Sequence, residues 1–255
     1  MELFSLQGQT AIITGGGRGL GAQIAEGYAE AGISNLVLCS RKKEACEAVA
    51  QQLHEQYGLN VLALPCDVTD AASVRQVVEQ TVATFGRLDI VVNNSGASWG
   101  APFLEMPQEA WQKVIDTNLT GTFLMSQAAA TAMAEHENGI ILNIASIAGF
   151  GGTPPFMETV GYNASKAGVM TMTKDLAVKL GKYNIRVNAI APGFFPTKMA
   201  NGLIEVGKEY IETHTPLGRL GGAQDLKGAA IFLASPAASY ITGAILPVDG
   251  GMSTY

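Results

Sequence analysis

The sequence predicts an α/β protein in which one doubly wound parallel sheet of about seven strands carries helices on both faces. Short apolar runs alternate with longer helical stretches from one end of the chain to the other. The runs are almost continuously apolar, which is typical of parallel strands buried on both faces. No Pro- or Gly-rich linker divides the series. Residues 1–255 are therefore expected to form a single domain.

The order of the elements follows from these runs. Strands are predicted at 10–14, 35–39, 60–64, 89–92, 139–144, 185–190 and 244–248. Helices are predicted between them, near 20–31, 43–57, 70–85, 108–134, 161–181 and 223–234. Ligands of such sheets bind beyond the carboxyl ends of the strands, so the chemistry is expected there.

One segment, 194–222, interrupts the alternation. It has no strand pattern and is punctuated by proline and glycine, at Pro196, Gly202, Gly207, Pro216 and Gly218. Segments of this kind often become ordered over a bound ligand. We expect 194–222 to form a mobile lid over the substrate.

Composition excludes several classes of protein. With 47% hydrophobic and 15% charged residues, the chain can form a sizeable core. A net charge of −6 with scattered Lys and Arg argues against general nucleic-acid binding. No apolar run approaches the roughly 18 residues of a membrane span, and the first residues lack the pattern of a secretory signal. Three cysteines at no metal-ligand spacing fit a reducing compartment. We expect a cytoplasmic protein without a metal site.

Glycines cluster where the first predicted strand meets the first helix, in Thr14-Gly15-Gly16-Gly17-Arg18-Gly19-Leu20-Gly21. Glycine lets the backbone approach a pyrophosphate, which then lies at the positive end of the helix. Gly15, Gly19 and Gly21 match G-x-x-x-G-x-G, whereas Gly17, Gly19 and Ala22 match G-x-G-x-x-A. The first alignment is preferred because it places a glycine directly after the strand. A simple tight turn is the alternative, but the position favours a dinucleotide site.

The end of the second strand indicates which dinucleotide binds. NAD enzymes of this fold have an acidic residue there for the ribose hydroxyls, but here Ser40 and Arg41 follow the strand, and the next carboxylate is Glu44. Arg41 can pair with a 2′-phosphate and Ser40 can donate its hydroxyl. Arg18 in the glycine turn is expected to face the same pocket. The alternative is that both arginines are solvated, but the pattern predicts NADP(H).

The reacting end is predicted from Tyr162 and Lys166, four residues apart and so on one face of a helix. A free tyrosine has a pKa near 10, and an adjacent cation would lower that pKa. Alone the pair is also compatible with an ordinary amphipathic helix. Two further residues strengthen it. Ser146 follows the strand 139–144, where its hydroxyl can reach a carbonyl, and Asn118 lies in a predicted helix, where asparagine is unfavourable. A turn-forming serine and a buried asparagine remain the alternatives for these two.

At this point the sequence resembles the short-chain dehydrogenase/reductase family over essentially its whole length. The resemblance rests on the glycine segment, Cys66-Asp67-Val68, Asn93-Asn94-Ser95-Gly96, Asn118, Ser146, Tyr162 with Lys166, and Pro192-Gly193 with Thr197. It implies a Rossmann fold that binds a nicotinamide cofactor, here NADP(H), beyond the carboxyl ends of the strands. Two departures are Ser95, where the family usually has alanine, and a longer separation between Ser146 and Tyr162, which includes 153–158.

The resemblance also implies roles for individual residues. Asp67 and Val68 would contact the adenine, and Asn94, Ser95 and Gly96 would line the cofactor floor. The nicotinamide carboxamide would be held by the segment from Pro192 and Gly193 through Phe195 to Thr197, and the phosphates by the turn that includes Leu20. Lys166 would bond the nicotinamide ribose, and Asn118 would position a water in a proton relay.

Together these features predict an NADPH-dependent oxidoreductase that reduces a ketone to a secondary alcohol, with Tyr162 as general acid/base and Ser146 polarising the carbonyl. A 3-oxoacyl-thioester reductase and a sugar-acid or polyol dehydrogenase are the enzymatic alternatives. A catalytically silent nucleotide sensor is the non-enzymatic one. The substrate side is expected to be apolar, from Trp99, Phe103, Phe150, Phe156, Met157, Phe194, Met199 and Leu203, about half of which would serve as core.

A homotetramer is predicted, largely from the resemblance. Small residues at 128–134 and 167–177 could allow close helix packing between subunits, although the same faces could pack within one subunit. The stretch 240–255 is unusually apolar for a chain end and is expected to be packed.

Overall fold

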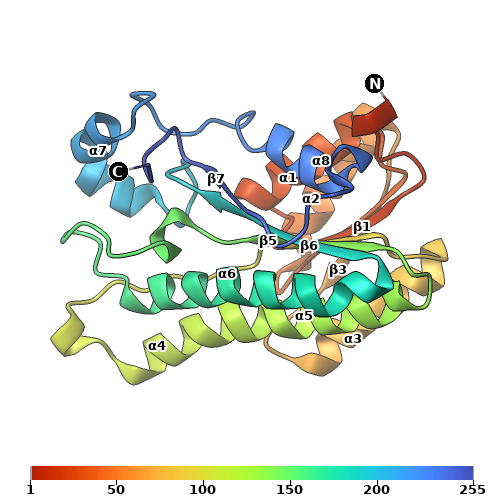
Figure 1. Ribbon diagram of the computed structural model, residues 1–255, viewed down its shortest axis with the longest axis horizontal. Helices are drawn as coiled ribbons and strands as arrows, with labels where there is room; N and C mark the ends of the chain where they lie inside the picture. Colours follow the sequence, from red (N-terminus) through yellow and green to blue (C-terminus); the bar gives the residue numbers. More distant parts are fainter. Residues whose placement is uncertain (1, 255) are drawn as a thin grey trace.

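The computed structural model describes residues 2–254 and contains one parallel sheet of seven strands (Figure 1). The strands lie in the order β3-β2-β1-β4-β5-β6-β7, and every neighbouring pair is parallel. The order reverses between β1 and β4, which opens a crevice at the carboxyl ends of these strands. Their bounds are β1 (Thr10–Thr14), β2 (Asn35–Ser40), β3 (Asn60–Pro65), β4 (Ile90–Asn93), β5 (Gly139–Ile144), β6 (Ile185–Pro192) and β7 (Ile245–Val248). The predicted fold class is confirmed.

Helices cover both faces of the sheet (Figure 1). One face carries α1 (Gly19–Glu30), α2 (Lys43–Tyr57) and α8 (Lys227–Ala234), and the other carries α3 (Ala71–Phe85), α5 (Gly121–Ala134) and α6 (Val160–Leu180). Successive residues of a strand point alternately into the two hydrophobic cores, one on each face of the sheet. Ile13 and Leu38 pack under the first group, whereas Ile12 and Val37 pack under the second. This period of two explains why the strands read as continuously apolar.

The predicted helix 108–134 is interrupted. It consists of α4 (Gln108–Ile115), a π-helical turn at Asp116–Thr120, and α5. The turn contains Asn118, which is completely buried. Gly121 follows the turn so close to β3's outgoing loop that a Cβ there would lie 2.8 Å from Val68. A π turn inside an α-helix is often found at a functional site.

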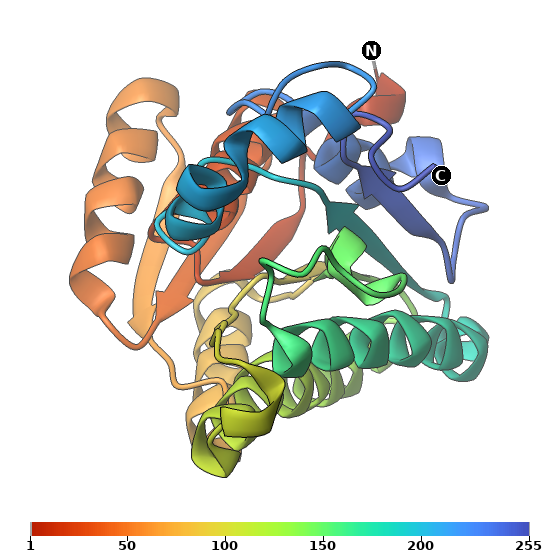
Figure 2. The same ribbon diagram turned by 90° about the vertical axis from the view of Figure 1, so that its left-hand side faces the viewer.

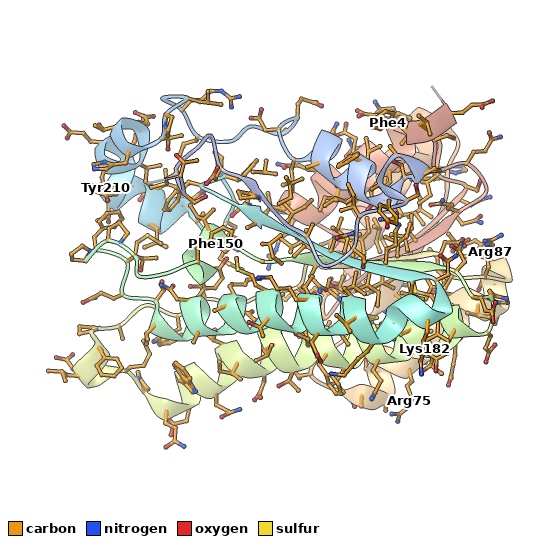
Figure 3. The ribbon with its side chains drawn as sticks, in the orientation of Figure 1. Phe4, Arg75, Arg87, Phe150, Lys182 and Tyr210 are labelled. Atoms are coloured by element: carbon orange, nitrogen blue, oxygen red, sulfur yellow. The ribbon has the colours of Figure 1, made fainter. Side chains whose placement is uncertain are left out.

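The segment 194–222 contains no strand among the described residues, as predicted, but it contains a helix that the sequence analysis missed. This helix, α7 (Asn201–His214), buries Ile204, Gly207 and Ile211 along one stripe. It lies beyond the carboxyl ends of the strands (Figure 1), and in Figure 2 it is the blue helix in the upper part of the picture, on the side that faces the viewer. Phe150 and Tyr210 lie together at this end, whereas Arg87 and Lys182 lie at the opposite end (Figure 3).

Within residues 2–254 no helix has the length and apolarity that crossing a membrane requires. The same residues contain no cluster of three or more His, Cys, Asp or Glu side chains arranged to hold a metal ion. The three cysteines are buried and do not form disulfides.

Candidate active site

A cavity of about 1430 Å³ opens at the carboxyl ends of the strands. It runs from the glycine turn after β1, past the ends of β4 and β5, to the space beneath α7. The catalytic and cofactor-binding residues predicted from the sequence line this cavity, with the exception of Asn118.

The glycine turn is built for close approach by a ligand. Gly15 and Gly19 have φ values of +66° and +54°, a region that favours glycine. A Cβ on Gly21 would lie 2.5 Å from both the Asn94 amide and the Gly15 carbonyl oxygen. These three positions support the preferred G-x-x-x-G-x-G alignment. Gly17 is needed for a separate reason, because a Cβ there would be 2.7 Å from the backbone of Ala45 in α2.

The turn leaves the start of α1 open to an anion. Arg18 is the N-cap residue, and its side chain makes no capping bond to the first N–H groups of the helix. Unpaired N–H groups at a helix N-terminus, together with the helix dipole, bind phosphate. The backbone at this end therefore fits the pyrophosphate of a dinucleotide, and Gly15, Gly17, Gly19 and Leu20 would hold it.

The loop after β4 is tied to this turn by hydrogen bonds. The Asn94 amide nitrogen Nδ2 donates to the carbonyl oxygens of Thr14 and Gly15, at 2.9 and 3.2 Å. The backbone N–H groups of Asn94 and Ser95 both donate to the Thr14 hydroxyl at 3.0 Å. Asn94, Ser95 and the adjacent Gly96 thus form a floor whose position depends on the glycine turn.

Arg18 and Arg41 both line the cavity at its adenosine end, as predicted. Asp67 lies there too, and its pKa is lowered chiefly by hydrogen bonds from the Thr69 backbone and hydroxyl, with a smaller contribution from the charge of Arg41. The Ser40 hydroxyl donates a 2.8 Å hydrogen bond to the Lys42 carbonyl. Its proton is therefore directed at the backbone, and not into the cavity as the sequence analysis expected.

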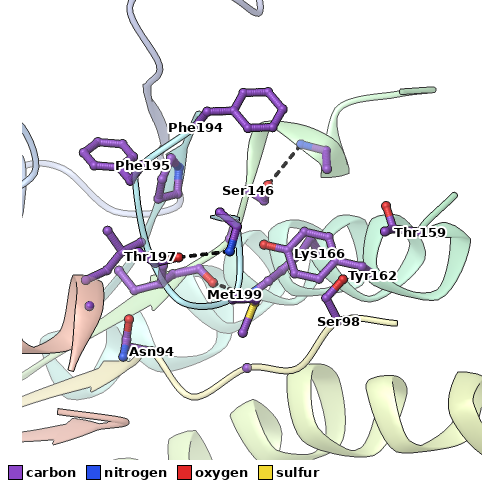
Figure 4. A pocket seen from close by; sticks show the side chains of 18 of the residues that line it. Asn94, Ser98, Ser146, Thr159, Tyr162, Lys166, Phe194, Phe195, Thr197 and Met199 are labelled. Carbon is purple, nitrogen blue, oxygen red and sulfur yellow. Dashed lines mark hydrogen bonds between the residues drawn. The ribbon is translucent and has the colours of Figure 1, made fainter. Parts of the chain in front are cut away.

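Ser146 and Tyr162 direct their hydroxyl groups into the same part of the cavity, between α6 and the segment carrying Phe194, Thr197 and Met199 (Figure 4). Ser146 lies two residues after β5, where it caps the following 3₁₀ turn, and it accepts a 3.2 Å hydrogen bond from the Ala148 N–H. The Ser146 O–H group can therefore donate a hydrogen bond to another acceptor. The 3₁₀ turn after it, Ile147–Gly149, lies against α6, where a Cβ on Gly149 would be 2.8 Å from the carbonyl carbon of Lys166.

Lys166 lies one helical turn after Tyr162, with its Nζ 5.6 Å from the centre of the phenol ring. The ammonium group is buried and donates a 2.7 Å hydrogen bond to the Ile144 carbonyl at the end of β5. Burial lowers the pKa of Lys166 to about 8. The adjacent lysine predicted a lowered pKa for Tyr162, but burial raises this pKa, with partial opposition from the Ser146 hydroxyl. Desolvation of the phenolate is the larger of these two effects.

Asn118 does not line the cavity, and its side chain is satisfied by protein groups. Its Oδ1 accepts a 2.7 Å hydrogen bond from the Ala97 N–H, while Nδ2 donates to the Ala97 carbonyl and the Ser165 hydroxyl at 2.9 Å. Its carbonyl accepts from the Thr122 hydroxyl at 2.7 Å. Asn118 therefore joins the loop after β4 to α6. The predicted water relay stays a prediction.

The far half of the cavity is enclosed by the loop 150–159 and α7. Five of the apolar residues expected there line the cavity: Phe150, Met157, Phe194, Met199 and Leu203. The other three, Trp99, Phe103 and Phe156, do not. Trp99 and Phe103 are exposed on the loop after β4. Phe156 packs between Gly207 and the ring of Tyr210, which it meets edge-on at 5.5 Å between centroids. The expectation that about half of the eight would serve as core is therefore wrong, because only Phe156 of these three packs against other side chains.

Comparisons with known proteins agree with this geometry. A family model described as enoyl-(acyl carrier protein) reductase matches residues 15–253. A 3-oxoacyl-[acyl-carrier-protein] reductase from Chlamydia trachomatis is 40% identical over 248 residues, which are 97% of this chain and 98% of that protein. The crystal structure of a short-chain type dehydrogenase/reductase from Mycobacterium marinum is 38% identical, with a TM-score of 0.95 and coverage of 100% and 99%. The chain belongs to the short-chain dehydrogenase/reductase family.

A further member of this family is similar along its whole length. It is a gluconate 5-dehydrogenase from Burkholderia cenocepacia, solved in complex with NADP and tartrate. It is 34% identical, with a TM-score of 0.94 and coverage of 100% of this chain and 98% of that one. The present chain is thus an oxidoreductase of the short-chain dehydrogenase/reductase family.

Several residues that line the cavity at its two ends were not among the predicted site residues. Lys42 and Cys66 lie beside predicted positions at the adenosine end. At the far end, Ser98, Thr153, Thr159, Lys198, Tyr210 and His214 also line the wall. Ser98 could have been found as the continuation of the Asn94–Gly96 floor. Tyr210 and His214 could have been found only by recognising α7 from the spacing of its buried stripe.

Proposed function

We propose that this oxidoreductase reduces a ketone to a secondary alcohol with NADPH, and that Tyr162 is its general acid/base. The observation that carries the proposal is the convergence of the Ser146 and Tyr162 hydroxyls on one space in the cavity, with the Lys166 ammonium behind the phenol (Figure 4). NADPH supplies the hydride when it is bound.

The chain's own groups would bind the carbonyl and supply a proton. With its oxygen already accepting from Ala148, Ser146 has its O–H to donate to a carbonyl oxygen. Because burial raises the pKa of Tyr162, the phenol is protonated at neutral pH and ready to donate. Nearby Lys166 would stabilise the phenolate left after transfer, since its charge lies within 5.6 Å of the ring centre.

The preference for NADPH rests on charge at the adenosine end. Arg18 and Arg41 line the cavity there, and the β2 terminus lacks the carboxylate that would repel a 2′-phosphate. Asp67 is the acidic side chain of this region, in the position that the family resemblance assigns to the adenine. Ser40 supports the loop through the Lys42 carbonyl.

A 3-oxoacyl thioester or a sugar acid or polyol would suit the same reacting groups, whereas a silent nucleotide sensor would have no use for them. We further propose one domain with 194–222 as a lid, a cytoplasmic location and a homotetramer. The tetramer is proposed partly from small residues at 128–134 and 167–177. One of them, Gly168, packs against Leu119 within the same subunit.

The decisive experiment is a panel of ketones and 3-oxoacyl thioesters assayed by NADPH absorbance with the wild type and Tyr162→Phe. Loss of most turnover is expected in the variant, with NADPH binding and the fold unchanged, because only the transferable proton is removed. Tyr183→Phe, in the 3₁₀ turn after α6 and not among the cavity residues, is the matched control and should behave as wild type. Substantial turnover by Tyr162→Phe on any accepted ketone would overturn the assignment.

A further inference from the structure

The loop 150–159 forms part of the wall of the far half of the cavity, but regular structure does not hold it in place. None of its residues, all of which the structure describes, belongs to a helix or a strand. Near its start, Gly151 and Gly152 are exposed, and a Cβ on either would meet no atom within 4 Å. Residues 153–158 also lie in the interval where the sequence departs from the family pattern. The position of this wall therefore depends on individual side-chain contacts.

Asn163, the residue after Tyr162, bridges the two ends of the segment 153–159. Its amide nitrogen Nδ2 donates a 3.0 Å hydrogen bond to the Thr153 hydroxyl. Its Oδ1 accepts a 3.1 Å hydrogen bond from the Thr159 hydroxyl. Asn163 belongs to α6, so both polar atoms of its side chain hold this segment against the start of the helix that carries Tyr162.

The directions of these bonds are consistent with one another. The Thr153 hydroxyl donates to the Met157 carbonyl at 3.4 Å, so it accepts from Asn163. Thr159 is the N-cap residue of α6, where a threonine hydroxyl usually accepts from an N–H group in the first turn of the helix. Here it makes no such bond and donates to Asn163 instead. Capping of α6 therefore does not explain the contact.

The bridge fixes residues that line the cavity, although Asn163 itself is not among them. Thr153, Met157 and Thr159 all belong to the wall. The middle of the loop has a second attachment through Phe156, which packs on α7. Any effect of Asn163 on a substrate must therefore pass through the loop, and loss of the bridge should loosen this wall without detaching it.

We propose that Asn163 is a positioning residue that determines substrate specificity, by holding the loop 150–159 where it encloses the body of a bulky ketone. This inference rests on the proposed carbonyl reduction and adds a specificity-determining residue to it. A small ketone would contact mainly the reacting hydroxyls, whereas a larger one would extend to Met157 and Phe150 in the wall. Loss of the bridge should therefore weaken binding of large substrates and leave small ones unaffected.

Two methyl ketones that differ only in a phenyl group, butanone and benzylacetone, separate these cases. If wild type prefers other ketones of the panel, its smallest and largest accepted methyl ketones form the pair. Asn163→Ala removes both bonds, whereas Thr153→Val and Thr159→Val each remove one and keep the shape of the side chain. Asn138→Ala and Thr131→Val, at exposed positions, are the matched controls and should behave as wild type.

We expect Asn163→Ala to raise KM for benzylacetone about tenfold, a loss on the scale of the hydrogen bonds removed. The KM for butanone should change less than about twofold. For both ketones kcat and its pH dependence should stay as in wild type, because Ser146 and Tyr162 keep their positions. In an enzyme that already carries Thr153→Val and Thr159→Val, Asn163→Ala should raise KM no further, since its partners are gone.

Hydrogen exchange tests the bridge without any substrate. The N–H groups of Met157 and Thr159 bond to carbonyl oxygens inside the loop at 2.8 Å. Both should exchange several times faster in Asn163→Ala than in wild type, because the segment opens more often. Exchange in β5, which is buried along its whole length, should be unchanged.

Two results would contradict the inference. One is an equal rise in KM for the two ketones or a fall in kcat, which would assign Asn163 to the reacting centre. The other is unchanged exchange in 150–159, which would show that the bridge does not hold the loop. Absence of wild-type turnover on every ketone of the panel would refute the proposed function and the specificity role with it, while the exchange measurement would still decide whether the bridge holds the loop.

Discussion

The ring of Phe156 occupies the space beside Gly207 that any larger side chain at that position would need. This contact joins the loop 150–159 to α7, the two segments that enclose the far half of the cavity. It continues through Tyr210, whose ring meets Phe156 edge-on and stacks on His214. Aromatic packing between the loop 150–159 and α7 therefore holds together the two segments that enclose the far half of the cavity.

Gly207→Ala is expected to separate these segments. Overpacking of a tight contact costs about 1–3 kcal/mol, and part of that cost should appear as movement of the loop and α7. We expect a lower melting temperature and a raised KM for the carbonyl substrate, with NADPH affinity unchanged. Thermal unfolding and steady-state kinetics measure these quantities.

The control for this variant lies on the same helix. A Cβ on Gly202 would meet nothing within 4 Å. Gly202→Ala should therefore stabilise α7 by roughly 0.5–1 kcal/mol through helix propensity, without raising KM. Equal effects of the two substitutions would show that the Phe156 contact does not position the cavity wall.

The lowered pKa of Lys166 predicts how stability changes with pH. The pKa is about 8 in the folded protein, below the ordinary 10.5, because the ammonium is buried. Between these values the unfolded chain binds more protons than the folded one, so this residue makes the free energy of unfolding rise as pH increases from 8 to 10.5. The full rise amounts to about 3 kcal/mol.

Lys166→Met should remove that rise. Urea unfolding of the apo protein at several pH values, with wild type and variant compared point by point, isolates the contribution. The comparison is best made below pH 10, because burial raises the pKa values of Tyr28 and Tyr162 and these groups act in the opposite direction above it. Parallel stability curves for the two proteins would mean that Lys166 titrates as an ordinary lysine.

Asn118→Ala tests whether this residue supports the site through its side chain. The substitution leaves the Ala97 N–H and carbonyl without their partner and removes the bond to the Ser165 hydroxyl, which keeps only its bond to the Tyr162 carbonyl; this should destabilise the fold by about 1–3 kcal/mol. Turnover should fall in the same variant. Asn138→Ala, at an exposed position after α5, should change neither. Lost turnover with unchanged stability would favour a relay role alone.

Arg41→Ala tests the choice of cofactor. If Arg41 and Arg18 both face a 2′-phosphate, wild type should prefer NADPH over NADH about ten- to a thousand-fold in kcat/KM. The variant should lose most of that preference by weakening use of NADPH, with NADH use little changed. Arg75→Ala, an exposed arginine on α3, is the control. Equal use of both cofactors by wild type would contradict the proposed role of this loop.

The sequence predicted the fold well because strands buried on both faces leave a strong local pattern. Strand bounds differ from prediction by at most two residues, the largest difference being β6, which continues to Pro192 through pairing with β7. The family and its oxidoreductase function are confirmed by the comparisons. Apart from Asn118, the predicted residues reach one cavity because they follow the carboxyl end of a strand or lie in the first two turns of a helix there.

What the sequence could not predict depends on contacts between distant segments. The π turn around Asn118 has no local signature, because the same residues are compatible with a regular helix. The direction of the Ser40 hydroxyl is set by the Lys42 carbonyl, and the pKa of Tyr162 by burial. α7 was missed because glycine and proline in 194–222 suggested an irregular segment, while its stripe at Ile204, Gly207 and Ile211 is short.

The π turn at 116–120 changes the rotational phase between α4 and α5. An α-helix advances about 100° per residue, so one additional residue in a turn rotates everything after it by that amount relative to everything before it. Removal of a single residue from this turn would restore a regular helix and swing Asn118 away from Ala97. α5 would then present a different face to β4 and β5, even though no core residue had been replaced. Insertions and deletions in this helix should therefore be far more harmful than substitutions on its exposed side.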